Sequence, residues 1–132
     1  VTGRLSLRDD KEPQLVINRA RPITDFTEEE LKNCIAKAYD SKFDTEEIAP
    51  MVKADGAYYL ELFHGATIAF KDMALSILPH LLTTSAKKND VKNDIVILTA
   101  TSGDTGKAAL AGFADVPGTR IIFECEQTIW AV

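Results

Sequence analysis

One lysine stands where its amine could do covalent chemistry. Lys71 follows a predicted strand and a short loop, and it stands near the start of a predicted helix. The positive end of a helix dipole disfavours an ammonium and helps to keep an amine neutral. Because a neutral amine attacks aldehydes, Lys71 is a candidate nucleophile. Its position alone does not distinguish it from an ordinary solvated surface lysine.

A second candidate site is the loop Thr101-Ser-Gly-Asp-Thr-Gly106, where a predicted buried strand turns into a helix. Its backbone N–H groups and hydroxyls are typical of sites that bind small anions, such as carboxylate or phosphate. A simpler interpretation is that Ser102 or Asp104 caps the helix while the glycines make the turn, and the residues alone favour it. The loop is not a P-loop, since the first glycine of that motif and the Ser or Thr after its lysine are missing.

Other polar residues near these loops give weaker signals. His64 could be an acid, a base or a hydrogen-bonding partner, although a lone histidine at the end of a strand is more often structural. Asp72 and Asp104 each stand at a predicted helix start, where the dipole already favours a carboxylate. We therefore interpret both as structural residues and not as an acid–base pair. No Cys or His group has metal-ligand spacing, so no metal site is predicted.

The composition limits the possible classes of protein. The chain has 132 residues and 45% hydrophobic content, which is enough for one compact domain. Its net charge of -5 argues against a nucleic-acid partner, which would require a surplus of Lys and Arg. Its longest apolar stretch, 73–82, is far shorter than the roughly 20 residues of a membrane span. Cys34 and Cys125 fit neither a zinc site nor a disulfide framework, so we expect a reducing, cytoplasmic setting.

The elements that must position both loops follow from hydrophobic periodicity and from capping signals. Thr27 and Glu30 form a capping box before a helical pattern of apolar residues. Pro79 should kink a later helix. The predicted elements are a helix at about 28–39, a short helical turn at 45–50, a strand at 57–63, a kinked helix at about 69–86, a strand at 94–100 buried on both faces, a helix at 107–113 and a strand at 119–123.

This alternation of strands and helices predicts an α/β fold with a mostly parallel sheet. Ligands of such sheets bind beyond the carboxyl ends of the strands, so the loops 64–71 and 101–106 could line one site. Residues 1–23 show little periodicity apart from a possible short strand at Leu15–Ile17. We therefore expect a weakly specified segment at 1–23 and an α/β domain at 24–132.

Two stretches resemble the signatures of the threonine synthase family: Leu60-Glu-Leu-Phe-His-Gly-Ala-Thr-Ile-Ala-Phe-Lys-Asp72 and Thr99-Ala-Thr-Ser-Gly-Asp-Thr-Gly106. That family belongs to the tryptophan-synthase-like, fold type II group of pyridoxal phosphate enzymes. The resemblance runs from about residue 24 to 122, with Ala66 where the family usually has proline. It implies a three-layer α/β fold that is incomplete in this chain, since the family's cofactor-phosphate loop lies downstream.

The resemblance implies that Lys71 holds pyridoxal phosphate as a Schiff base and shuttles protons during catalysis. The implied enzyme is a carbon–oxygen lyase acting on phosphates, which converts O-phosphohomoserine and water to threonine and phosphate. Phe70 and His64 would shape the cofactor pocket. Thr67 is expected to cap the helix that carries Lys71.

The same resemblance implies that Ser102, Gly103, Asp104 and Thr105 receive the α-carboxylate of the substrate. A bare Asp104 carboxylate would repel that group, so we expect it to point away or to pair with a cation. An N-terminal portion of the enzyme would hold the cofactor weakly and turn over little or nothing alone.

Two alternatives remain open. One is a threonine-synthase-like phospholyase acting on another phosphorylated amino compound. The other is a non-catalytic chain whose exposed sheet edge leads to self-association.

Overall fold

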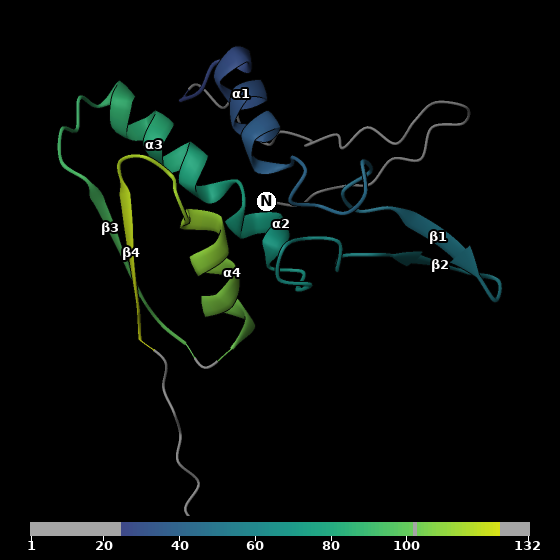
Figure 1. Ribbon diagram of the computed structural model, residues 1–132. Helices are drawn as coiled ribbons and strands as arrows, with labels where there is room; N and C mark the ends of the chain where they lie inside the picture. The colour runs from purple at the N-terminus through teal and green to yellow at the C-terminus, as the bar shows by residue number, and fades with distance from the viewer. Residues whose placement is uncertain (1–24, 102, 125–132) are drawn as a thin grey trace, which may run out of the picture.

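Four helices and four strands make up the described part of the chain, residues 25–101 and 103–124, in a computed structural model (Figure 1). The possible strand at Leu15–Ile17 lies outside the described residues. The elements in chain order are α1 (Glu28–Ala38), β1 (Met51–Ala54), β2 (Ala57–Leu60), α2 (Asp72–Leu75), α3 (Leu78–Lys88), β3 (Ile95–Ala100), α4 (Asp104–Phe113) and β4 (Thr119–Glu124).

The described strands form two separate pairs. β3 and β4 are parallel, with Ile95 opposite Thr119, and α4 connects them. This pair confirms the predicted α/β fold with a parallel sheet. The strand predicted at 57–63 does not join it, because it ends at Leu60 and pairs antiparallel with β1, which the sequence analysis missed. The two pairs lie on opposite sides of the helices (Figure 1).

A two-residue turn explains the unexpected hairpin. Asp55 and Gly56 have φ angles of 49° and 80°, and the strands pair immediately on either side of them. Positive φ at both central positions is the geometry whose twist suits two-residue hairpins, and Asp-Gly is a preferred sequence for it. This dipeptide was the signal that could have predicted β1.

Helix α1 confirms its predicted start. The Thr27 hydroxyl accepts a hydrogen bond from the Glu30 backbone N–H at 3.2 Å, and the Glu30 carboxylate accepts one from the Thr27 N–H at 2.7 Å. The Glu30 carboxylate also pairs with Lys88 of α3 at 2.8 Å. The predicted helical turn at 45–50 is wrong: only a turn forms there, and Ile48 has a φ of 61°, which a right-handed helix excludes.

The helix predicted at 69–86 is two helices, so the prediction of one kinked helix is wrong. α2 has a single turn that ends at Leu75, and Pro79 lies in the first turn of α3. Proline has no N–H to bond the carbonyl four residues earlier and clashes with it, but it is well suited to a first helical turn. The Leu75 carbonyl instead faces α4: a Cβ on Gly112 would lie 2.2 Å from its oxygen.

The parallel pair is covered on one face in the described part of the chain. Helix α4 packs on that face so closely that a Cβ on Gly106 would lie 2.0 Å from the Phe123 ring. Residues on the other face are exposed, Leu98 by 73% and Val96 and Ile122 by 56% each. The expectation that the strand at 94–100 is buried on both faces is therefore wrong, since helices cover only one. No described helix combines the length and apolar character needed to cross a membrane.

The contact between α2 and α4 can be tested with two glycine substitutions. Gly112→Ala should destabilise the chain by about 1–3 kcal/mol, because its methyl group meets backbone atoms of Leu75 that cannot rotate away. Gly103→Ala is the control at the N-cap of the same helix, since its methyl group would meet no atom within 4 Å. Urea unfolding compares the two variants. A loss for Gly112→Ala no larger than that for Gly103→Ala would contradict the close backbone contact.

Candidate functional site

Lys71 lies at the N-cap of α2, as the sequence predicted for a helix start. Its Nζ lies 4.3 Å from the centroid of the Phe70 ring, which is 62% exposed. Lys71 itself is half-buried, and no carboxylate of a described residue lies within ion-pairing distance of its Nζ. Two predicted site residues, Phe70 and Lys71, are therefore in contact, and the amine is not committed to an anion.

The next residue, Asp72, is buried with 3% exposure and ties down the loop that precedes Lys71. Its carboxylate accepts hydrogen bonds from the Thr67 backbone N–H at 2.8 Å and from the Thr67 hydroxyl at 2.6 Å. A Cβ on Gly65 would lie 2.5 Å from Asp72. The structural interpretation of Asp72 is confirmed. The prediction that Thr67 caps α2 is wrong, because its hydroxyl donates to Asp72 and α2 has no side-chain cap.

Ile68, in the middle of this loop, has a strained backbone. Its φ is 62° and its side chain is 73% exposed. A β-branched residue rarely occupies the left-handed region, and such a conformation costs on the order of 1–3 kcal/mol. It persists only where the surroundings fix it. Here the bonds of Thr67 to Asp72 and of the Ile68 N–H to the Gly65 carbonyl, at 3.0 Å, supply that restraint.

His64, at the start of the loop, lies between two carboxylates. Its Nδ1 lies 2.5 Å from Asp44 Oδ1, and its Nε2 lies 2.9 Å from Glu61 Oε2. The hydrogen bonds to Glu61 and then to Asp44 raise the pKa of His64 above its ordinary value. The side chain is 14% exposed and packs against Phe63. Both ring nitrogens thus face protein carboxylates, and a contact of His64 with a cofactor remains a prediction.

The second loop leads into α4 at Gly103. Gly103 is the N-cap and no described side chain caps the helix, so the expectation that Asp104 caps it is wrong. Ser102 lies outside the described residues. Asp104 Oδ1 lies 3.6 Å from Lys107 Nζ, which confirms the expected pairing with a cation. The N–H groups of Asp104 and Thr105 in the first turn therefore have no side-chain acceptor in the described part of the chain.

The two loops lie on elements that pack together, but no hydrogen bond or ion pair between described residues joins them. Helix α2 meets α4 at Gly112, near the C-terminal end of α4. Gly103 lies at the other end, and a helix of ten residues spans about 15 Å. In Figure 1 the turn before α4 accordingly lies at the far end of α4 from α2. The expectation that the loops line one site remains a prediction.

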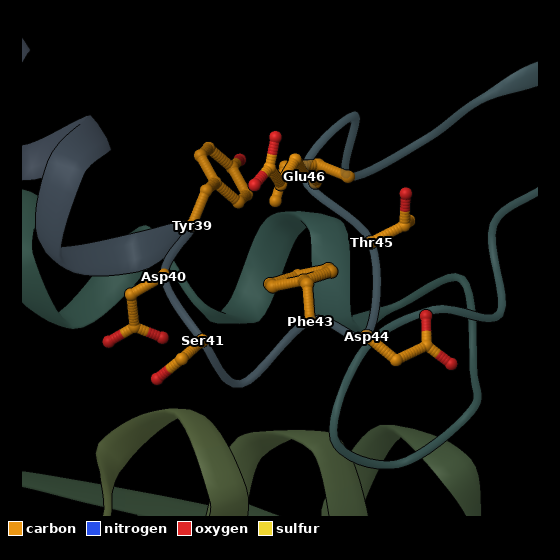
Figure 2. A pocket seen from close by; sticks show the side chains of 8 residues that line it. Tyr39, Asp40, Ser41, Phe43, Asp44, Thr45 and Glu46 are labelled. Atoms are coloured by element: carbon orange, nitrogen blue, oxygen red, sulfur yellow. The ribbon is translucent and has the colours of Figure 1, made fainter.

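A cavity of about 440 Å³ is lined by side chains between Tyr39 and Ile48, in the segment that contains Asp44 (Figure 2). None of the predicted site residues lines it. Figure 2 shows the Asp44 carboxylate directed away from the Phe43 ring, and this is the carboxylate that binds His64. The sequence analysis missed both partners of His64. Glu61 is only three residues away and could have been found, whereas Asp44 is twenty residues earlier in a segment without periodicity.

Two aspartates at helix starts provide a test of the tie between Asp72 and Thr67. Asp72→Ala should lower the free energy of unfolding by about 1–3 kcal/mol, because it leaves the Thr67 N–H without its acceptor. Asp104→Ala is the matched control, and its exposed pairing with Lys107 should be worth no more than about 0.5 kcal/mol. Chemical denaturation measures both. A loss for Asp72→Ala as small as that of the control would show that the tie does not hold the loop.

No family model matches the chain. It is 38% identical over 102 residues to threonine synthase-like 1 of Pongo abelii, which covers 76% of this chain and 13% of that protein. It is 38% identical over 98 residues to threonine synthase of Schizosaccharomyces pombe, covering 69% of this chain and 19% of that protein. The crystal structure of PLP-bound threonine synthase from Brucella melitensis superposes with a TM-score of 0.64 at 32% identity, covering 72% of this chain and 20% of that one. The chain thus spans less than a fifth of the curated relatives named here.

Proposed function

The matched part of this chain has a threonine synthase-like fold, and we propose that the chain is a portion of a pyridoxal phosphate-dependent threonine synthase. The observation that carries the proposal is the Lys71 amine, which lies against the exposed Phe70 ring without a carboxylate partner among the described residues. Cys34 is a free thiol, which suits the reducing, cytoplasmic setting proposed for such an enzyme.

The residues around Lys71 fit the proposed cofactor. An amine without a carboxylate partner among the described residues needs no such anion displaced before it attaches to the aldehyde carbon of pyridoxal phosphate, and the Phe70 ring offers an apolar surface beside it. When bound, the cofactor supplies a ring that withdraws electrons from the substrate. Lys71 Nζ would take up and return the proton moved during the reaction. His64, at the start of the loop that leads to Lys71, would help to shape the cofactor pocket.

The start of α4 fits the proposed role of binding the substrate carboxylate. The N–H groups of Asp104 and Thr105 have no side-chain acceptor among the described residues, and the N-terminus of a ten-residue helix favours an anion. The pairing of Asp104 with Lys107 reduces the repulsion that its carboxylate would exert. We propose that Gly103, Asp104 and Thr105, together with Ser102, receive the α-carboxylate of O-phosphohomoserine. An assay of the full-length parent with this substrate separates it from a phospholyase acting on another phosphorylated amino compound.

Covalent capture tests the role of Lys71. The chain is incubated with limiting pyridoxal phosphate, reduced with borohydride and mapped by peptide mass spectrometry. Lys71 should be labelled at least about tenfold more than an average exposed lysine, a preference of about 1.4 kcal/mol. Lys71→Ala should remove this label.

Lys107→Ala is the matched control and should leave the label at Lys71 unchanged, since Lys107 is an exposed lysine paired with Asp104. Labels spread evenly over the lysines would sink the assignment of Lys71 as the cofactor lysine.

The open face of β3 and β4 favours a second candidate function, self-association. Val96, Leu98 and Ile122 are exposed on this face, and neither strand has a second neighbour among the described strands. Exposed apolar faces and unpaired strand edges are common sites of association. We propose that two copies of the chain bury this face against each other.

Light scattering after size-exclusion chromatography tests the second candidate. The wild-type chain should run as a dimer or larger species at high concentration, and Leu98→Lys should shift it toward monomer, because a buried ammonium opposes burial of the face. Val91→Lys is the control, since Val91 is 50% exposed in the turn after α3. A wild-type chain that stays monomeric at all concentrations would rule out self-association.

A further inference from the structure

Three contacts tie His64 to two segments that precede it in the sequence. Its ring nitrogens lie 2.5 Å from the Asp44 carboxylate and 2.9 Å from the Glu61 carboxylate. Its backbone carbonyl also accepts a hydrogen bond from the Asp44 N–H at 3.0 Å. Asp44 follows α1, and Glu61 follows β2. His64 therefore joins two separate parts of the fold at the point where the loop to Lys71 begins.

The geometry at His64 favours a ring in which both nitrogens carry a proton. A neutral imidazole has one N–H donor, and its other nitrogen presents a lone pair. With a carboxylate oxygen at hydrogen-bonding distance from each nitrogen, a neutral ring would place that lone pair against a negative charge. The imidazolium donates to both carboxylates, so the arrangement of three side chains is complete only while His64 is protonated.

The loop that follows His64 is short and already restrained at its other end. Gly65 is packed against Asp72, Thr67 is bonded to Asp72, and Ile68 has the strained φ of 62°. A strained backbone conformation persists only where the surrounding structure fixes it. Asp72 holds the end next to Lys71, and His64 holds the other.

We propose that Asp44 and Glu61 are positioning residues, which hold the loop 64–71 through protonated His64 and release it when His64 loses its proton. The consequence for Lys71 rests on the proposed function, in which the amine of Lys71 binds pyridoxal phosphate. His64 would then affect cofactor capture by fixing the loop and not by touching the cofactor.

The sign of the pH dependence follows from the contacts. The carboxylates of Glu61 and Asp44 raise the pKa of His64 above its ordinary value of 6.5, and no other charged residue in the described part of the chain contributes to that rise. A group with a raised folded pKa stabilises the fold fully below its unfolded pKa, and this stabilisation is lost as pH rises through the folded pKa. The restraint on the loop should thus be complete below about 6.5 and weaken above the raised pKa of His64.

Nitrogen NMR and amide exchange test the restraint without any cofactor. In the wild-type chain the His64 ring should titrate above 6.5, with both nitrogens protonated below that point. Asp44→Asn and Glu61→Gln should each lower this titration. They should also speed exchange of the Thr67 N–H, measured against its intrinsic rate, by about tenfold in the pH range where the wild-type ring is protonated.

Glu46→Gln is the matched control, since Glu46 is an acidic residue of the same segment with no contact to His64. It should leave both measurements unchanged. A wild-type His64 that titrates at or below 6.5 overturns the proposal, and this measurement needs no variant to fold. Thr67 exchange that responds equally to all three variants overturns it as well.

Capture of pyridoxal phosphate at Lys71, followed over pH, tests the consequence for the site. The ratio of capture by the wild type to capture by Asp44→Asn or Glu61→Gln should exceed about threefold at low pH and approach one as pH rises through the titration of His64. A ratio that does not change with pH overturns the positioning role. If the wild type shows no preference for Lys71 while the NMR results hold, the proposed function fails but the proton-dependent restraint stands.

Discussion

The buried carboxylate of Asp72 is the interaction on which the arrangement around Lys71 depends. A carboxylate with 3% exposure must find donors, and it finds two on Thr67, five residues earlier. Bonding backward over so short a distance forces the chain into a tight loop, which requires Gly65 at the point of closest approach and a left-handed Ile68. Asp72 is buried at the start of a single-turn helix, while its neighbour Lys71 is only half-buried.

The same short helix also sets the distance between the two candidate loops. Pro79 prevents α2 and α3 from forming one helix, and the Leu75 carbonyl thereby lies at the end of a turn, against Gly112. A helix that approaches backbone to backbone has little freedom to slide, so the position of α4 depends on this contact. The start of α4 at Gly103 then lies about the length of α4 away from the contact with α2.

The sequence predicted elements that carry a strong local signal and missed one whose signal is weak. The capping box at Thr27 and the apolar run of β3 were sufficient for their elements, because each signal lies within a few residues of the structure it determines. β1 has every residue exposed, so it carries no alternation of buried and exposed positions, and the Asp55-Gly56 turn after it is its one local signal.

The candidate site follows the same division. The place of Lys71 at the start of a helix was predictable from the strand, the loop and the helical pattern around it. The contacts of Asp72 with Thr67 were not, since a carboxylate at a helix start is already explained by the dipole and gives no reason to expect burial. The tie between Asp44 and His64 joins residues twenty apart, and only the fold brings them together.

The loop 64–71 and the sheet of β3 and β4 differ in how far the described residues supply the contacts that each of them needs. Among the described residues, the hydrogen bonds that hold the loop 64–71 come from residues 44–72, and no buried side-chain polar atom lacks a partner. The sheet is different, because Leu98 and its neighbours leave one face apolar and open. A hydrogen bond needs only one nearby partner in the right direction, whereas an apolar face is removed from water only when another surface covers it. The geometry around Lys71 therefore depends on local polar contacts, and it does not require the open face of the sheet to be covered.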